Sequence, residues 1–140
     1  MINKYVIDSS VFVSALGQPD TFSEASQQLF FHLEKNPGII LVPTLVTLEV
    51  LVNLHKQEYP IQEASDILQC FQSLPLNEEL TYAVATFLTK SKTSLKASDF
   101  SIALLAHLNE ATLITWDKRL LAEGTSICPV STPTEWLSKV

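Results

Sequence analysis

Four acidic residues are ambiguous one by one but together indicate a metal site: Asp8, Glu49, Asp99 and Asp117. Carboxylate oxygens are hard ligands that suit Mg²⁺ or Mn²⁺. A carboxylate cluster without His or Cys ligands is typical of metal-assisted phosphoryl chemistry. Spacing alone does not bring Glu49 and Asp99 to the same crevice, so this prediction depends on how the chain folds.

Two of the acids follow apolar segments that we expect to be buried strands. Asp8 closes the segment Lys4–Asp8, and Asp117 comes two residues after Thr112–Thr115. Since the carboxyl ends of parallel strands lie at one edge of a sheet, both side chains would face the same crevice. The ordinary alternatives are a turn or capping role for Asp8 and a cap on the next short helix for Asp117.

Glu49 is the only charged residue between Lys35 and Lys56. It lies in a segment that is apolar nearly all round, which is typical of a buried helix. A lone buried carboxylate is costly unless it is paired or bound to a metal ion. The alternative is that one edge of this helix is solvated and that Glu49 faces water.

Asp99 begins a helical segment and shares its apolar face with Ile102, Ala103 and Ala106. Its side chain is therefore expected to point toward the core side of the helix start. The alternative is a first-turn acid that the helix dipole stabilises. The dipole explains the position of Asp99 along the helix but not the face that it occupies.

Short apolar strands alternate with helices along the chain. We expect strands at Lys4–Asp8, Ile39–Val42, Leu74–Leu76, Thr112–Thr115 and, at an edge, Ser126–Pro129. We expect helices at Ser9–Leu16, Thr21–Lys35, Thr44–Glu58, Pro60–Ser73, Asn77–Lys92, Ala97–Asn109, Lys118–Ala122 and after Thr132. Capping boxes at Thr21–Glu24 and Thr132–Glu135 and a cap at Asn77 would begin three of them. The alternation predicts an α/β fold of Rossmann-like type, a short parallel sheet flanked by helices on both faces, in a single domain spanning 1–140.

Composition narrows the functional classes. The 140 residues carry a net charge of −6, which argues against a general basic coat for nucleic acid but not against a nuclease with a metal pocket. The two cysteines, Cys70 and Cys128, lie far apart without zinc-site spacing, and we expect both to be small buried hydrophobic residues. No apolar run of about 18 residues and no signal-peptide pattern is present, so we expect a cytoplasmic protein without a membrane span.

The segments around the four acids resemble a known family. Asp8-Ser9-Ser10 follows an apolar strand, and Glu49 lies in an apolar helix that begins after a proline. LKASDFSIALLA surrounds Asp99, and LITWDKRL surrounds Asp117. In this order, and over essentially the whole chain, they resemble the PIN domain and, within it, the VapC-type toxin ribonucleases of bacterial toxin–antitoxin pairs.

The resemblance implies a four-acid pocket that holds Mg²⁺ or Mn²⁺ and cuts RNA. The family's four acids correspond to Asp8, Glu49, Asp99 and Asp117. Its two supporting hydroxyls correspond to Ser10 and Thr115, for which ordinary strand-end hydrogen bonding is the alternative. Many members carry a further acid after the last one, whereas this chain has Lys118 and Arg119 there. In this interpretation a metal ion polarises a phosphate oxygen while an acid orients the attacking water.

Partners follow from the resemblance and from the remaining side chains. Lys96, Lys118 and Arg119 would grip RNA phosphates, or else they are solvated residues at helix ends. Trp116 would stack on a base or cover the sheet edge. Such toxins are blocked by an antitoxin protein and usually dimerise. A homodimer is also predicted by the apolar residues of the helix from Thr21, which are Phe22, Leu29, Phe30, Phe31 and Leu33, and by the segment from Thr44. The rival interpretation is a catalytically silent PIN-like domain that binds a protein.

Overall fold

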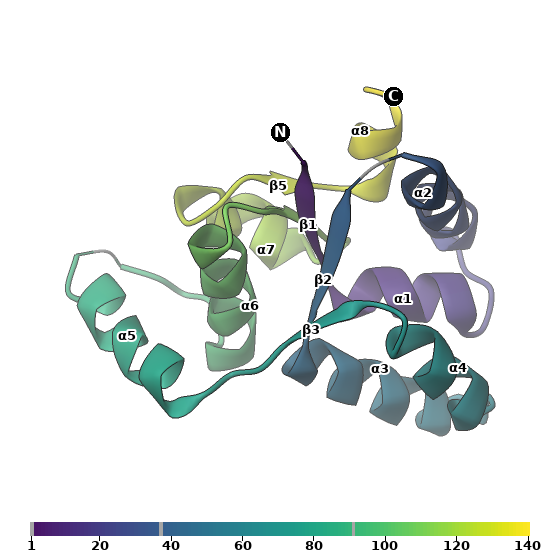
Figure 1. Cartoon of the computed structure of the whole chain (residues 1–140), viewed down its shortest axis with the longest axis horizontal. Coiled ribbons are helices and arrows are strands. Elements are labelled where there is room, and N and C mark those ends of the chain that lie inside the picture. The colour runs from purple at the N-terminus through teal and green to yellow at the C-terminus, as the bar shows by residue number, and fades with distance from the viewer. Residues whose placement is uncertain (1, 37, 91) are drawn as a thin grey trace.

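A five-stranded parallel sheet forms the centre of the molecule in the computed structural model, which describes residues 2–36, 38–90 and 92–140 (Figure 1). The strands are β1 (Lys4–Ile7), β2 (Ile39–Pro43), β3 (Gln72–Leu74), β4 (Thr112–Ile114) and β5 (Val130–Ser131). Their order is β3-β2-β1-β4-β5, so β1 pairs with both β2 and β4. This confirms the parallel sheet that the alternating pattern predicts.

Helices cover both faces of the sheet. They are α1 (Ser9–Leu16), α2 (Ser23–Lys35), α3 (Thr44–Lys56), α4 (Ile61–Leu68), α5 (Glu78–Leu88), α6 (Ala97–Leu108), α7 (Lys118–Glu123) and α8 (Pro133–Leu137). The chain steps from β1 outward to β3 and then returns to β4, so right-handed crossovers place α1–α4 on one face and α5–α7 on the other. Figure 1 shows this division, with α5 standing apart from the rest of the molecule.

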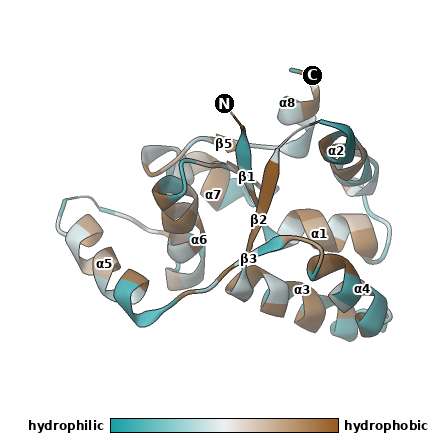
Figure 2. Ribbon diagram, in the orientation of Figure 1, coloured by the Kyte–Doolittle hydropathy of each residue, from teal (hydrophilic) through white to brown (hydrophobic). Residues whose placement is uncertain are grey.

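The core lies between these layers. β1, β2 and β4 end in fully or nearly fully buried apolar residues because helices cover both faces of the sheet. Seven consecutive residues of α6, from 100 to 106, are buried. Cys128 is buried as predicted, whereas the prediction is wrong for Cys70, which is exposed. Figure 2 shows hydrophobic residues along β2 and on the inner sides of the helices, with hydrophilic residues on the outer sides. No helix of the described segments is long and apolar enough to cross a membrane.

Two strands are shifted from their predicted positions. β3 occupies Gln72–Leu74 instead of Leu74–Leu76, because Pro75 has no N–H group with which to continue the ladder. β5 occupies Val130–Ser131 instead of Ser126–Pro129. A 3₁₀ turn at Gly124–Ser126 takes up the earlier residues, and Ile127 N donates to Gly124 O at 2.9 Å.

The capping box predicted at Thr21–Glu24 is wrong. Helix α2 begins at Ser23 without a side-chain cap, and a turn built on Asp20 precedes it. Asp20 Oδ1 accepts from Phe22 N at 2.8 Å, and Asp20 N donates to Ser23 Oγ at 2.8 Å. Asp20 and not Thr21 therefore organises the turn at the start of this helix.

The other two helix starts agree with the sequence. Asn77 Oδ1 accepts from Leu80 N at 2.8 Å, and Thr132 Oγ1 accepts from Glu135 N at 3.0 Å. Several helices end earlier than predicted, α4 at Leu68 and α5 at Leu88. The helix corresponding to α5 is predicted to continue to Lys92, and residue 91 in that stretch lies outside the described residues.

Candidate active site

The carboxyl ends of β1 and β4 meet at the sheet edge where the predicted acids lie. Ile7 is in register with Ile114, and Asp8 N donates to Ile114 O at 3.0 Å. Asp8 directly precedes α1 and is 4% exposed. Asp117 directly precedes α7, and its Oδ1 accepts from two backbone N–H groups of that helix, at 2.9 and 3.0 Å. The capping role of Asp117 therefore coexists with a position at the crevice.

Two hydroxyl groups hold the Asp8 carboxylate. Ser10 Oγ and Thr115 Oγ1 both donate to Asp8 Oδ2, at 2.9 and 2.7 Å. The same hydroxyl oxygens accept from the next turn of chain, Ser10 Oγ from Trp116 N at 3.1 Å and Thr115 Oγ1 from Asp117 N at 2.9 Å. These bonds tie Asp8 to the chain that follows β4, so the orientation of its carboxylate is fixed before any ligand binds.

Burial shapes the protonation of Asp8. Removal from water raises the pKa of this carboxyl, and the negative charge of Asp117 adds to the rise. The hydrogen bonds from Thr115 and Ser10 act in the opposite direction, because they stabilise the charged form, but they do not outweigh burial. A cation bound beside Asp8 would therefore stabilise the charged form of this buried carboxyl.

Glu49 reaches the same crevice from α3. It is half-buried, and its Oε1 atom is buried without a hydrogen-bond partner among the described residues. Burial raises the pKa of Glu49 to about 7, and the negative charges of Asp8, Asp99 and Asp117 contribute to the rise. An acid whose buried oxygen is unsatisfied and whose neighbours are acids is expected to bind either a proton or a cation.

Asp99 lies in the first turn of α6 and is half-buried. Burial raises the pKa of Asp99, followed by the negative charges of Asp117 and Asp8, while Lys96 and Arg119 lower it. Asp99 therefore lies close to two other acids and also to two basic side chains. Its position agrees with the prediction that it faces inward at the helix start.

The four acids approach one another without forming a finished ligand cage. Within 2–36, 38–90 and 92–140, no group of three or more His, Cys, Asp or Glu side chains is arranged to hold a metal ion directly. Mg²⁺ usually keeps several water ligands and binds one or two carboxylates, so it does not require such a cage. The all-oxygen donor set and the unsatisfied Glu49 oxygen both fit this mode of binding.

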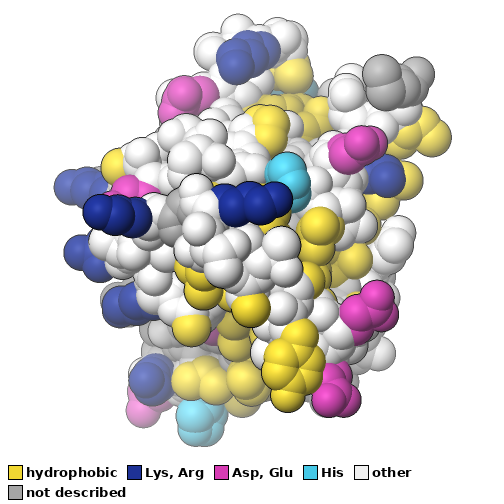
Figure 3. Space-filling model, turned by 90° about the vertical axis from the view of Figure 1, so that its left-hand side faces the viewer, with side chains coloured by type: hydrophobic (Ala, Val, Ile, Leu, Met, Phe, Trp, Pro, Cys, Tyr) yellow, Lys and Arg dark blue, Asp and Glu magenta, His cyan; other side chains and the backbone are white. Residues whose placement is uncertain are grey.

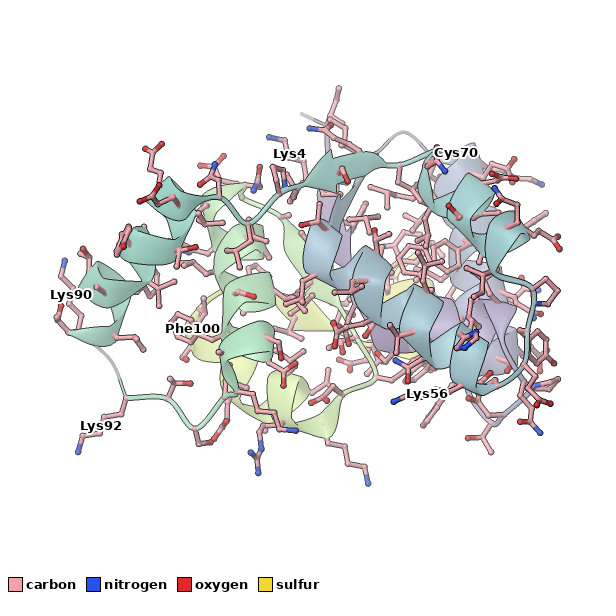
Figure 4. The ribbon with its side chains drawn as sticks, turned by 90° about the horizontal axis from the view of Figure 1, so that it is seen from below. Lys4, Lys56, Cys70, Lys90, Lys92 and Phe100 are labelled. Atoms are coloured by element: carbon pink, nitrogen blue, oxygen red, sulfur yellow. The ribbon has the colours of Figure 1, made fainter. Side chains whose placement is uncertain are left out.

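Basic residues border the crevice on one side. Lys96 directly precedes α6, and Lys118 and Arg119 are the first two residues of α7; all three are exposed. In the view from below, α3 and α6 lie to either side of this edge of the sheet (Figure 4). Figure 4 places Lys90 and Lys92 at the outer end of α5 and in the loop after it, away from the crevice.

One pair of aromatic residues beside the site was not anticipated. Trp116 stacks on Phe22, with ring centroids 4.4 Å apart, and its Nε1 donates to Ser26 Oγ at 2.8 Å. The sequence predicts that Phe22 lies within the helix from Thr21, whereas it precedes α2. No spacing signal connects residues this far apart in the chain, so only the fold reveals their contact.

The chain was compared with protein-family models, curated proteins and solved structures. The family model of the PIN domain matches residues 5–123, a range that includes all four acids. The comparison with curated proteins gives no match.

Several solved structures have the same fold, and they include a toxin–antitoxin complex and a toxin. A toxin–antitoxin complex from Klebsiella pneumoniae matches with a TM-score of 0.69 and 20% identity, over 92% of this chain and 97% of that chain. VapC20 from Mycobacterium tuberculosis, described as a toxin that cleaves the sarcin–ricin loop, matches with a TM-score of 0.69 and 11% identity, over 84% and 93%. FitAcB from Neisseria gonorrhoeae matches with a TM-score of 0.68 and 19% identity, over 93% and 98%. At these identities the likeness establishes the fold.

Proposed function

Because the chain belongs to the PIN-domain family, we propose that it is a metal-dependent endoribonuclease and the toxin of a type II toxin–antitoxin pair. A fold alone does not determine a function, so the proposal depends on the site. The observation that carries it is the half-buried Glu49, with its unsatisfied oxygen, in electrostatic contact with Asp8, Asp99 and Asp117. Such a group of acids destabilises the protein unless a cation binds it.

Each acid has a proposed role toward Mg²⁺ or Mn²⁺. Asp8 and Asp99 would hold the ion, and Glu49 and Asp117 would complete the site directly or through water. When bound, the ion supplies charge stabilisation at the scissile phosphate and a more acidic bound water. Ser10 and Thr115 position the Asp8 carboxylate through their hydrogen bonds to Oδ2.

Glu49 also suits proton transfer. A general base is most effective when its pKa lies near the working pH, and the pKa of Glu49 is raised to about 7. In the crevice without metal, the Glu49 carboxyl therefore exchanges a proton near neutral pH. Asp117 is held by two backbone N–H groups of α7, so we assign it the fixed, orienting role and assign proton transfer to Glu49.

RNA would approach from the basic side of the crevice. Lys96 and Arg119 lie close enough to Asp99 to lower its pKa, which supports their placement at the rim. Lys118 is exposed beside them. We propose that these three residues contact the phosphates next to the cleaved bond.

Protein partners are proposed from exposed apolar surface. Leu29 and Leu33 of α2 are buried within the molecule, so they are not available for a dimer. Leu48 and Val52, one turn apart on α3, are 59% and 43% exposed. Figure 3, which views the α5 side, shows further hydrophobic side chains between basic ones. We propose a homodimer through α3, and an antitoxin that blocks the toxin in the cytoplasm.

Cleavage by the purified protein tests the proposed function. Wild type is expected to cut RNA with Mg²⁺ or Mn²⁺ and to stop with EDTA. Asp99→Asn is expected to lose most of the rate, because the site loses a charged ligand. Asp66→Asn is the matched control, since Asp66 is exposed on α4. Metal binding without cleavage of any RNA would favour the silent interaction domain instead.

A further inference from the structure

The stack of Phe22 on Trp116 leaves an aromatic ring open beside the site. The two ring planes are inclined by only 23°, so one face of the phenyl ring covers the indole. Trp116 is half-buried, whereas Phe22 remains 43% exposed in spite of the stack. The exposed surface of Phe22 therefore lies largely on the side away from Trp116.

Trp116, whose indole lies beneath Phe22, is held by one side-chain and one backbone hydrogen bond. Trp116 Nε1 donates to Ser26 Oγ at 2.8 Å, and Ser26 is fully buried in α2. Trp116 N donates to Ser10 Oγ at 3.1 Å, which connects the same residue to the Asp8 network. Two hydrogen bonds at opposite ends of the residue leave the indole little freedom to turn.

The backbone of Phe22 is fixed as well. Its N–H donates to Asp20 Oδ1 at 2.8 Å, in the turn that Asp20 and Ser23 close before α2. A ring that is already ordered loses little conformational entropy when a ligand packs on it. The pair is thus a preformed flat surface and not a flexible loop residue.

Trp116 belongs to the same short stretch of chain as several charged groups of the site. Thr115 donates to Asp8, Asp117 is one of the four acids, and the exposed Lys118 and Arg119 come next. Because Trp116 comes just before these cations in the chain, RNA held at Lys118 and Arg119 would come near Trp116 and the ring that covers it. Because the acidic crevice repels phosphate, uncharged contacts of this kind add binding energy that electrostatics does not supply.

We propose that Phe22, backed by Trp116, is a stacking platform for one unpaired base of the RNA. This inference rests on the proposed function and adds the side chains that hold an unpaired nucleotide beside the cleaved bond. A base in a duplex has both faces covered by its neighbours, so it does not stack on the platform. Base–aromatic stacking tolerates every base, so the platform selects for an unpaired nucleotide and not for a sequence.

Variants at Phe22 test the platform against matched changes at Phe31. Phe31 is 50% exposed on α2 and packs against Lys35 instead of Trp116. Binding of a labelled RNA of about twelve adenines is measured with Mg²⁺ at one salt concentration, in Asp99→Asn protein so that cleavage does not interfere. Phe22→Leu keeps Trp116 covered but removes the aromatic face, and it is expected to weaken binding about five- to hundredfold. Phe31→Leu is expected to bind like the parent.

Phe22→Trp keeps the platform and reports on it directly. Its tryptophan emission is expected to be quenched when the RNA binds, whereas that of Phe31→Trp is not. A series of probes places a single abasic nucleotide at each position in turn. Binding to the parent is expected to weaken for one position of the abasic nucleotide. Binding to Phe22→Leu is expected to weaken for none, because this variant has already lost the stack.

The platform is overturned if Phe22→Leu binds as tightly as Phe31→Leu, if Phe22→Trp emission is unchanged on binding, or if the parent does not bind the probe. Failure of the proposed function gives a different result. In that case wild type with Mn²⁺ cleaves no RNA, even if the probe binds and quenches the emission of Phe22→Trp. In active protein the platform predicts a higher KM for Phe22→Leu with little change in kcat, since the stack is present before and during the reaction.

Discussion

Replacing Glu49 by glutamine is expected to stabilise the metal-free protein at alkaline pH and to have little effect in mild acid. The pKa of this carboxyl is 4.5 when unperturbed and about 7 in the folded protein, chiefly because burial disfavours its charged form. Between these values the folded state binds more protons than the unfolded chain, so wild-type stability falls as pH rises through this window. The glutamine side chain has no proton to lose, so the Glu49→Gln variant escapes the fall.

The size of the effect follows from the same pKa values. The full rise corresponds to about 3 kcal/mol, at about 1.4 kcal/mol for each pH unit. Because Glu49 is only half-buried, solvent screening reduces this to about 1 kcal/mol of unfolding free energy. The repulsion between Glu49 and the negative charges of Asp8, Asp99 and Asp117 is already included in the raised pKa of Glu49, and the mutation removes it together with the burial cost.

Urea denaturation in EDTA at about pH 5.5 and pH 8.5 measures the effect. The expected result is that Glu49→Gln exceeds wild type by roughly 0.6 kcal/mol more at pH 8.5 than at pH 5.5, because about two fifths of the screened 1 kcal/mol is already lost by pH 5.5. Glu34→Gln, an exposed change on α2, is the control and is expected to show no such difference. An equal stability difference at both pH values, or a variant less stable than wild type at pH 8.5, would refute the electrostatic account of the crevice.

Three further predictions test the supporting residues. Thr115→Val removes the hydroxyl that donates to Asp8 at 2.7 Å. The affinity for Mn²⁺, measured by calorimetry, is expected to fall about 10- to 100-fold. An unchanged affinity would mean that this hydroxyl only forms hydrogen bonds at the end of its strand. Arg119→Gln is expected to weaken RNA binding and to reduce the slope of log affinity against log salt by about one, and an unchanged slope would remove Arg119 from the phosphate contacts. Leu48→Glu is expected to convert a homodimer into a monomer by light scattering, whereas a dimeric variant would place the interface elsewhere.

The sequence predicts the parts of this structure that depend on local pattern. Uniformly apolar short segments place β1, β2 and β4 within a residue or two, because strands covered on both faces have no polar side. Asp8 and Asp117 are brought to one sheet edge as expected, since parallel pairing alone decides where these strands end. Asn77 caps α5 because its side chain needs a backbone N–H only three residues away.

Contacts between residues that are far apart in the chain are harder to predict from the sequence. Glu49 and Asp99 meet only because α3 and α6, on opposite faces of the sheet, both lie at its carboxyl edge, and no spacing encodes that arrangement. The stack of Phe22 on Trp116 is hidden for the same reason. The failed capping box at Thr21 shows a different limit, because Asp20 one residue earlier offers a competing acceptor, a charged carboxylate that binds N–H groups more strongly than a hydroxyl does.

The central claim, that the four acids form one metal site, is tested most directly by thermal melting with and without Mn²⁺. A metal that binds only the folded site stabilises it by about 2.7 kcal/mol at a hundredfold excess over its dissociation constant. Wild type is expected to melt higher with millimolar Mn²⁺ than with EDTA. Asp99→Asn is expected to melt above wild type in EDTA, because one repelling charge is gone, and to gain less from Mn²⁺. Equal metal-induced shifts in wild type and Asp99→Asn would contradict the claim.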